Sequence, residues 1–135
     1  MHFIFDANLS FRLSDGLEIL EKGDTKSAIK KIDHADKLVG KGATDPDIIR
    51  IAGKTHAIII SQDDDFKRIK SNKELIKQLK VGYVMYRPPK HGSRYWEIVQ
   101  SFILGWPEIK RVLASKRPPF LYQINKDGKM QEVEL

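Results

Sequence analysis

The chain has 135 residues, 41% of them hydrophobic, which is enough for one domain with a single core. It contains no cysteine, and this excludes disulfides, thiolate zinc sites and a cysteine nucleophile. The formal net charge is +6, and no apolar run is long enough for a membrane span. We therefore expect a cytoplasmic, soluble protein without membrane attachment, with one domain over residues 1–135.

The first third of the chain predicts one clear strand and one clear helix. His2–Phe5 is a short apolar run of the kind found in buried strands. Leucines near helical spacing over residues 9–20 predict a helix that ends at Gly23. The pattern over residues 25–43 is weaker: Ala28, Ile29 and Ile32 could form a short strand, and Gly40-Lys41-Gly42 reads as a loop.

The middle of the chain has stronger signals. Thr44–Asp47 combines a capping residue, a proline and two acids, which is typical of a helix start. Ala57–Ile60 is continuously apolar and β-branched, as in a central parallel strand. A basic helix is predicted over residues 65–79, and another strand over 81–86.

The last third predicts helices and a hairpin. A helix is expected over residues 95–104, with a further helical turn from Pro107 to about 114. Residues 121–124 and 130–133, joined around Asp127 and Gly128, predict a β-hairpin.

Strands that alternate with helices predict right-handed βαβ units and a mostly parallel sheet. The expected fold class is therefore α/β, with three layers in which helices flank the sheet. We expect a core over about residues 1–117 and a C-terminal hairpin extension over about 118–135.

Acidic residues fall at the predicted strand ends, where open α/β sheets form their sites. Asp6 ends the first strand, and Asp63 ends the central strand, with Asp65 close by. Asp45 opens the helix that leads into the central strand and could reach the same edge. Converging carboxylates repel one another, and a hard divalent cation would relieve that repulsion. A turn or a helix cap is the alternative role for each of these residues.

Three segments together resemble a PIN domain, closest to the compact proteins presumed to be VapC-type toxins. The resemblance covers about residues 1–90, and its ordered motifs are Asp6-Ala7-Asn8-Leu9, Thr44-Asp45-Pro46-Asp47-Ile48-Ile49 with Ala52, and Ile58-Ile59-Ile60-Ser61-Gln62-Asp63-Asp64-Asp65-Phe66. It implies a parallel sheet between helices and a ribonuclease that depends on Mg²⁺ or Mn²⁺.

The resemblance also implies roles for particular acids. It assigns metal binding to Asp6, Asp45 and Asp63, and a catalytic role to these three with Asp65. PIN nucleases usually carry a further acid, often Glu, on a helix between the first two motifs. This sequence has no clear equivalent there, only the group Asp33, His34 and Asp36.

Charge is divided unevenly along the chain. Residues 1–65 hold 9 Lys/Arg and 12 Asp/Glu, a net charge of −3, whereas residues 66–135 hold 15 and 6, a net charge of +9. An acidic half beside a basic half suits a polyanionic substrate. The cations expected to bind substrate are Lys67, Arg68, Arg87, Lys90 and Arg94. A solvated helix face is the alternative for the first two.

The resulting hypothesis is a PIN-type endoribonuclease that uses Mg²⁺ or Mn²⁺, as the toxin of a toxin–antitoxin pair. RNA is the expected partner, together with an antitoxin protein, and a homodimer is a further option. The lack of a clear further acid between the first two motifs motivates an alternative, a catalytically weak PIN-like module that binds RNA or protein.

Overall fold

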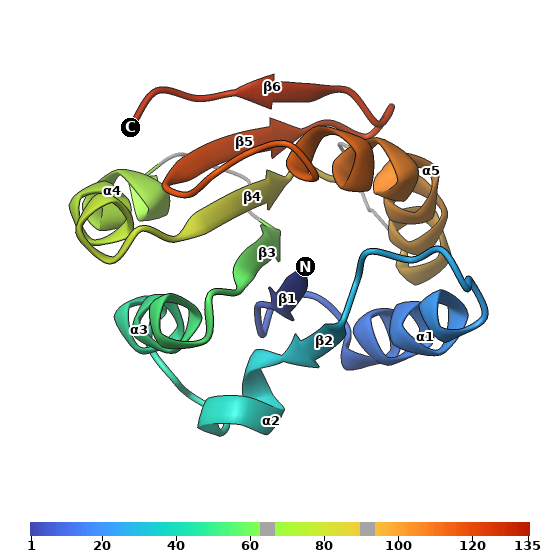
Figure 1. Ribbon diagram of the computed structural model, residues 1–135, viewed down its shortest axis with the longest axis horizontal. Coiled ribbons are helices and arrows are strands. Elements are labelled where there is room, and N and C mark those ends of the chain that lie inside the picture. The colour runs from blue at the N-terminus through green and yellow to red at the C-terminus, as the bar shows by residue number, and fades with distance from the viewer. Residues whose placement is uncertain (63–66, 90–93) are drawn as a thin grey trace.

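The computed structural model describes residues 1–62, 67–89 and 94–135. One six-stranded sheet runs through them in the order β2-β1-β3-β4-β5-β6 (Figure 1). All neighbouring strands are parallel except β5 and β6, which are antiparallel. The strands are β1 (His2–Phe5), β2 (Lys31–His34), β3 (Ile58–Gln62), β4 (Gly82–Tyr86), β5 (Phe120–Ile124) and β6 (Met130–Glu132).

Helices cover both faces of this sheet, so the described chain has three layers. In Figure 1, α1 and α5 lie on one side of the sheet, and α3 and α4 lie on the other. The helices are α1 (Phe11–Lys22), α2 (Ala35–Val39), α3 (Asp45–Thr55), α4 (Lys67–Leu79) and α5 (Tyr95–Leu113). The expected α/β fold, with a mostly parallel sheet flanked by helices, is confirmed.

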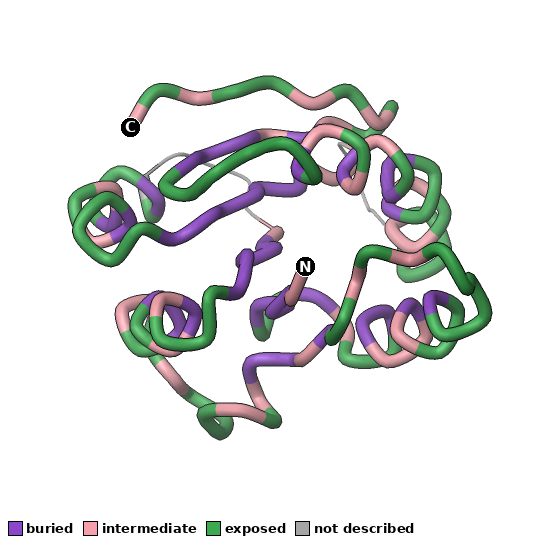
Figure 2. Tube along the Cα trace, viewed as in Figure 1, coloured by how far each residue is buried: buried purple, intermediate pink, exposed green. Residues whose placement is uncertain are grey.

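The layers follow from the period-two alternation of side chains along each strand. Phe3 and Phe5 are fully buried in the core that α1 and α5 cover. Ile4 is equally buried on the opposite face, in the core that α3 and α4 cover. Burial on both faces explains the uninterrupted apolar runs Phe3–Phe5 in β1 and Ile58–Ile60 in β3. Figure 2 shows the inner strands buried and the outer helix surfaces exposed.

One prediction for the helices is wrong, and one helix was not predicted. One continuous helix, α5, replaces the two that Pro107 was expected to separate. Trp106, Ile109 and Leu113, which lie on either side of the proline, are buried in the core, and this burial outweighs the one backbone hydrogen bond that proline removes. The short helix α2 precedes the predicted loop at residues 40–42 and had not been predicted.

The C-terminal hairpin is part of the main sheet. Its strands β5 and β6 form the predicted hairpin, and β5 also pairs in parallel with β4 along its whole length. Phe120, Leu121 and Tyr122 are buried. The boundary expected near residue 117 stays a prediction, and the hydrogen-bonded sheet continues across it.

The strand order reverses between β1 and β3. The chain passes from β1 to β2 in one direction, and then returns to place β3, β4 and β5 on the other side. In open parallel sheets, the crevice at the carboxyl ends beside such a reversal is the usual place for a site. Asp6 directly follows β1, and Gln62 is the last residue of β3, so both border this crevice.

Within the described ranges, no helix has the length and apolar character needed to cross a membrane.

Candidate acidic site

Asp6 is held rigidly at the end of β1. Its backbone N–H donates to the Ile60 carbonyl at 2.8 Å, which extends the pairing with β3 by one residue, and its carbonyl accepts from Leu9 at 3.0 Å. Asp6 lies two residues after Ile4, so its side chain points to the same face of the sheet, the one that α3 and α4 cover. Asp6 is only 3% exposed. A carboxylate so deeply buried requires compensating partners.

One of these partners is local and the other is distant in sequence. Asp6 Oδ1 accepts the backbone N–H of Ala7 at 2.7 Å. Asp6 Oδ2 accepts from Arg68 Nη2 at 2.8 Å. Both carboxylate oxygens therefore have a donor.

Asp45 reaches the same point from the first residue of α3. Thr44 caps this helix by accepting the N–H of Asp47 at 3.3 Å, and the Asp47 carboxylate accepts the N–H of Thr44 at 3.2 Å. This reciprocal capping box leaves the Asp45 side chain without a capping duty. The alternative reading of Asp45 as the helix cap is therefore wrong, because Thr44 fills that position.

Arg68 joins the two carboxylates. Its Nη2 atom lies 2.8 Å from Asp6 Oδ2 and 2.5 Å from Asp45 Oδ1, and its Nε lies 2.7 Å from Asp45 Oδ2. Asp45 is thus bound through both oxygens, and Asp6 shares one nitrogen with it. The hydrogen bonds that Arg68 donates to Asp45 raise the pKa of the guanidinium further above its ordinary value. Burial opposes this rise, and the negative charges of Asp6 and Asp45 reinforce it.

Two more side chains surround this group. Asn72 lies one helical turn after Arg68, and its Nδ2 is 3.5 Å from Asp45 Oδ2 and 3.0 Å from the Arg68 carbonyl. Tyr83 on β4 is buried beneath the site. Burial raises the pKa of the Tyr83 hydroxyl, and the negative charges of Asp6 and Asp45 raise it further. This phenol therefore stays protonated around neutral pH.

Asn8 ties the β1 loop to the end of β3. Its Nδ2 donates to the Gln62 carbonyl, and its Oδ1 accepts the N–H of Gln62 at 3.2 Å. The side-chain amide thus takes the place of a backbone peptide group beyond the last strand pair. It fixes the direction in which the chain leaves β3, one residue before Asp63.

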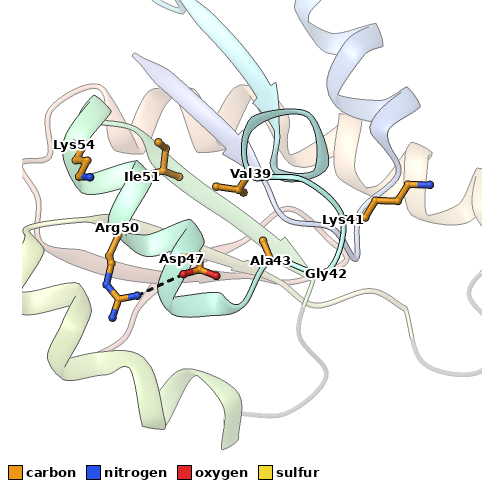
Figure 3. A pocket seen from close by; sticks show the side chains of 8 residues that line it. All are labelled: Val39, Lys41, Gly42, Ala43, Asp47, Arg50, Ile51 and Lys54. Carbon is orange, nitrogen blue, oxygen red and sulfur yellow. Dashed lines mark ion pairs between the residues drawn. The ribbon is translucent and has the colours of Figure 1, made fainter.

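Asp47 belongs to a different surface. Two residues along an α-helix correspond to a rotation of about 200°, so Asp45 and Asp47 face in opposite directions. Figure 3 shows Asp47 directed toward Arg50, to which it is paired at 3.5 Å. The pocket drawn there has a volume of about 500 Å³ and is lined by Val39, Lys41, Gly42, Ala43, Asp47, Arg50, Ile51 and Lys54. Because Asp6, Asp45 and Arg68 do not line it, this pocket is separate from the acidic site.

The residues between the first two motifs, Asp33, His34 and Asp36, have partners other than Asp6 and Asp45. Asp33 Oδ2 lies 2.7 Å from His2 Nε2 and 3.6 Å from Lys31 Nζ. The His34 ring is buried, with Nε2 2.7 Å from the Leu9 carbonyl and Nδ1 accepting the N–H of Asp36 at 3.2 Å. None of these contacts reaches Asp6 or Asp45. Among the residues that the structure describes, no group of three acids and histidines is arranged to hold a metal.

The remaining predicted site residues stay predictions. Asp63, Asp65 and Lys90 lie outside the described residues. Lys67 is the first residue of α4. Arg87 follows β4 and donates its backbone N–H to the Ile124 carbonyl at 2.9 Å, and Arg94 is the exposed N-cap residue of α5.

The donor chemistry of the pair fits Mg²⁺ or Mn²⁺. Asp6 and Asp45 present carboxylate oxygens to one shared cationic atom, and hard divalent cations prefer such oxygens. Mg²⁺ keeps several waters, so one or two carboxylates are sufficient protein ligands. The position from which these residues would hold a metal is the one that the Arg68 guanidinium contacts.

The described residues form an α/β sheet with a carboxylate pair beside its reversal point. The family model described as PIN like domain matches residues 1–87, which include both carboxylates, Arg68 and Tyr83. The chain therefore belongs to the PIN-like domain family, whose members are generally nucleases and typically use divalent metals. No curated protein and no solved structure gives a significant match.

Three residues at the site make contacts that were not predicted from the sequence. Arg68 was expected to bind substrate, which stays a prediction, and its contacts with both carboxylates were not foreseen. Asn72 carried a usable signal, because residues i and i+4 share one face of a helix. The contact of Asn8 with Gln62 joins residues 54 positions apart, and no local pattern announces it.

Proposed function

We propose that this protein is a metal-dependent endoribonuclease of the PIN type. The observation that carries the proposal is the convergence of Asp6 and Asp45 on one cationic position at the sheet reversal. Asp63 and Asp65 complete the proposed acidic set, as the resemblance to PIN domains implies. The proposal extends the nuclease-type fold of the family to a particular substrate and site.

The acids would act by holding and orienting Mg²⁺ or Mn²⁺ at the strand ends. Such an ion lowers the pKa of a bound water and offsets negative charge at the phosphate that is attacked. Asp6 contributes a rigid carboxylate, because its backbone is fixed to β3 and its Oδ1 is fixed by Ala7. Asp45 contributes a carboxylate whose position the α3 capping box sets.

RNA is the proposed substrate, and charge supports it. The net charge of +9 over residues 66–135 attracts a polyanion toward the acidic edge. We propose Lys67, Arg87, Lys90 and Arg94, together with Arg68, as its phosphate contacts. The cellular role proposed with this activity is that of a toxin whose partner is an antitoxin protein.

Cleavage of a fluorescent single-stranded RNA tests the proposal. We expect turnover with Mn²⁺ or Mg²⁺, none with chelator, and losses above about 100-fold in Asp6→Asn and Asp45→Asn, because residues that merely support a ligand already cost 10- to 100-fold. Asp15→Asn is the control, since this acid lies on α1 and pairs with Lys37 rather than with Arg68. Full activity in both site variants would refute the site.

One observation favours a second function, a catalytically weak module that binds RNA. Arg68 already neutralises part of the acidic pair, and the described residues hold no third acid beside it. This alternative predicts salt-dependent RNA binding without turnover. Metal-dependent cleavage that Asp45→Asn abolishes would exclude it.

A further inference from the structure

Arg68 contacts the same carboxylate oxygens that a divalent cation would need. Asp45 Oδ1 and Oδ2 each accept one of its hydrogen bonds, and Asp6 Oδ2 accepts a third. The only other donor to Asp6 side-chain oxygens among the described residues is the Ala7 N–H, on Oδ1. A metal that binds both Asp6 and Asp45 must therefore compete with the guanidinium.

The surroundings allow Arg68 to leave these oxygens. Its side chain is 42% exposed, whereas those of Asp6 and Asp45 are 5% and 22% exposed. The carboxylates are thus anchored in the fold, and the guanidinium approaches them from the solvent side. A long side chain on the first turn of α4 can turn outward without a change in the backbone.

Charge balance also favours replacement of the Arg68 guanidinium by a divalent cation. Two carboxylates carry a charge of −2, which one guanidinium only half neutralises and one divalent cation neutralises fully. The guanidinium cannot lose its proton in a protein, so it must move away rather than become neutral when a second cation arrives.

We propose that Arg68 is the resident counter-ion of the acidic pair and that the divalent cation of the proposed nuclease displaces it. This proposal rests on the proposed function. It assigns Arg68 two states: paired with Asp6 and Asp45 when metal is absent, and released from them when metal is bound. The released guanidinium is then free to contact a phosphate, the role that the sequence predicts for it.

Mn²⁺ binding measured by calorimetry, without RNA, tests the competition. We expect Arg68→Gln to bind Mn²⁺ at least about ten-fold more tightly than the unmodified protein, because charge-assisted hydrogen bonds no longer oppose the ion. Lys70→Gln removes the same charge two residues along α4, from an exposed position, and controls for long-range electrostatics with a change below about three-fold. Equal affinities in the two variants would overturn the proposal.

The Arg68→Gln variant leaves two buried or half-buried acids without their cation, and so its folding needs its own measurement. We expect a lower melting temperature without metal, and a larger upward shift on adding Mn²⁺ than in the unmodified protein, since a ligand stabilises the state that it binds. An equal Mn²⁺ shift in both proteins would also contradict exchange.

A titration of the unmodified protein with Mg²⁺, followed by NMR of arginine side chains, requires no variant. The Arg68 Nε–H signal should move as Mg²⁺ binds. Arg111, whose Nε donates to Glu108 at 2.8 Å, offers a matched guanidinium–carboxylate pair whose signal should stay in place. An Arg68 signal that is unchanged at saturating Mg²⁺ would overturn the proposal.

These results separate the two proposals. Mn²⁺ binding that Arg68→Gln strengthens, combined with no RNA cleavage, would support exchange and refute the nuclease function. RNA cleavage combined with unchanged Mn²⁺ affinity in Arg68→Gln would support the nuclease function and refute the displacement of Arg68. No Mn²⁺ binding by either protein would refute both.

Discussion

Single side chains decide how the strand ends of this fold are arranged. Asn8 illustrates this, because its amide replaces a peptide group where β1 has already turned away from β3. Asp6 continues the backbone pairing with β3 by donating to the Ile60 carbonyl. The Asn8 side chain then hydrogen-bonds to both the backbone N–H and the backbone carbonyl of Gln62. Gln62 is thereby held by the Asn8 side chain on the β1 side, in addition to its sheet pairing with Tyr86 of β4.

Removing this amide should loosen the end of β3. We expect Asn8→Ala to lower the free energy of unfolding by about 1 kcal/mol, the usual contribution of such hydrogen bonds, and to speed exchange of the Gln62 amide hydrogen. Asn8→Asp keeps the acceptor and loses the donor, so Gln62 should stay protected in it. Hydrogen exchange by NMR measures both effects, and unchanged exchange in Asn8→Ala would contradict this account.

At the scale of elements, a polar group ties α1 to α5. Glu21 is buried near the end of α1. Its Oε1 accepts from Trp106 Nε1 at 2.8 Å and from Lys110 Nζ at 2.7 Å, and its Oε2 accepts from Ser27 at 2.6 Å. Burial alone would raise the pKa of Glu21, but these hydrogen bonds lower it below its ordinary value of 4.5.

The lowered pKa determines how stability should depend on pH. A carboxylate with a lowered folded-state pKa stabilises the fold above about pH 4.5, and this contribution is lost as the pH falls through the folded-state value. We expect Glu21→Gln to cost about 1–3 kcal/mol in urea unfolding at pH 7, and the difference from the unmodified protein to shrink as the pH falls below 4.5.

A surface pair on α5 provides the control for this measurement. Glu108 accepts two hydrogen bonds from Arg111 in an exposed i,i+3 arrangement. Glu108→Gln should change stability little, because exposed ion pairs are screened by solvent. A loss as large as that of Glu21→Gln would show that the buried position of Glu21 is not the cause.

The elements that were predicted correctly are those with a strong local pattern. The strand around Ile59 and the helix after Thr44 could be read from apolar runs and caps alone. The continuity of α5 through Pro107 could not, since it depends on burial against the sheet. The strand-end rule placed Asp6 at this edge, and Asp45 was expected to be able to reach it from the start of its helix. The contact of Arg68 with both acids depends on how α4 packs, which no local pattern contains.

At the scale of the whole molecule, the two unequally charged halves meet within one sheet. The acidic first half supplies β1, β2 and β3, and the basic second half supplies α4 and the rest of the sheet. Arg68 is the point where a cation of the second half is joined to two acids of the first. An RNA that approaches the acidic edge therefore meets the positive half beside it.

RNA affinity should depend steeply on salt. In chelator Arg68 stays paired with Asp6 and Asp45, so four proposed cations remain to contact phosphates: Lys67, Arg87, Lys90 and Arg94. The logarithm of the binding constant should then fall with the logarithm of salt with a slope of about −2.8, from about −0.7 per contact on single strands. Fluorescence anisotropy in chelator, without cleavage, measures it. Arg94→Gln should reduce this slope by about 0.7, whereas Lys22→Gln, which removes a charge paired with Glu18 in the acidic half, should not. A slope near zero would contradict RNA binding through phosphates.

The reversal of strand order makes the acidic pair depend on residues that are far apart in the sequence. The Asp6 backbone is fixed by Ile60 in β3, and the guanidinium that joins Asp6 to Asp45 belongs to Arg68 in α4. The joint contact of the two carboxylates with one cation therefore requires β3 and α4 to be in place together. A partly folded chain without them would leave the Asp6 carboxylate with the Ala7 N–H as its described donor.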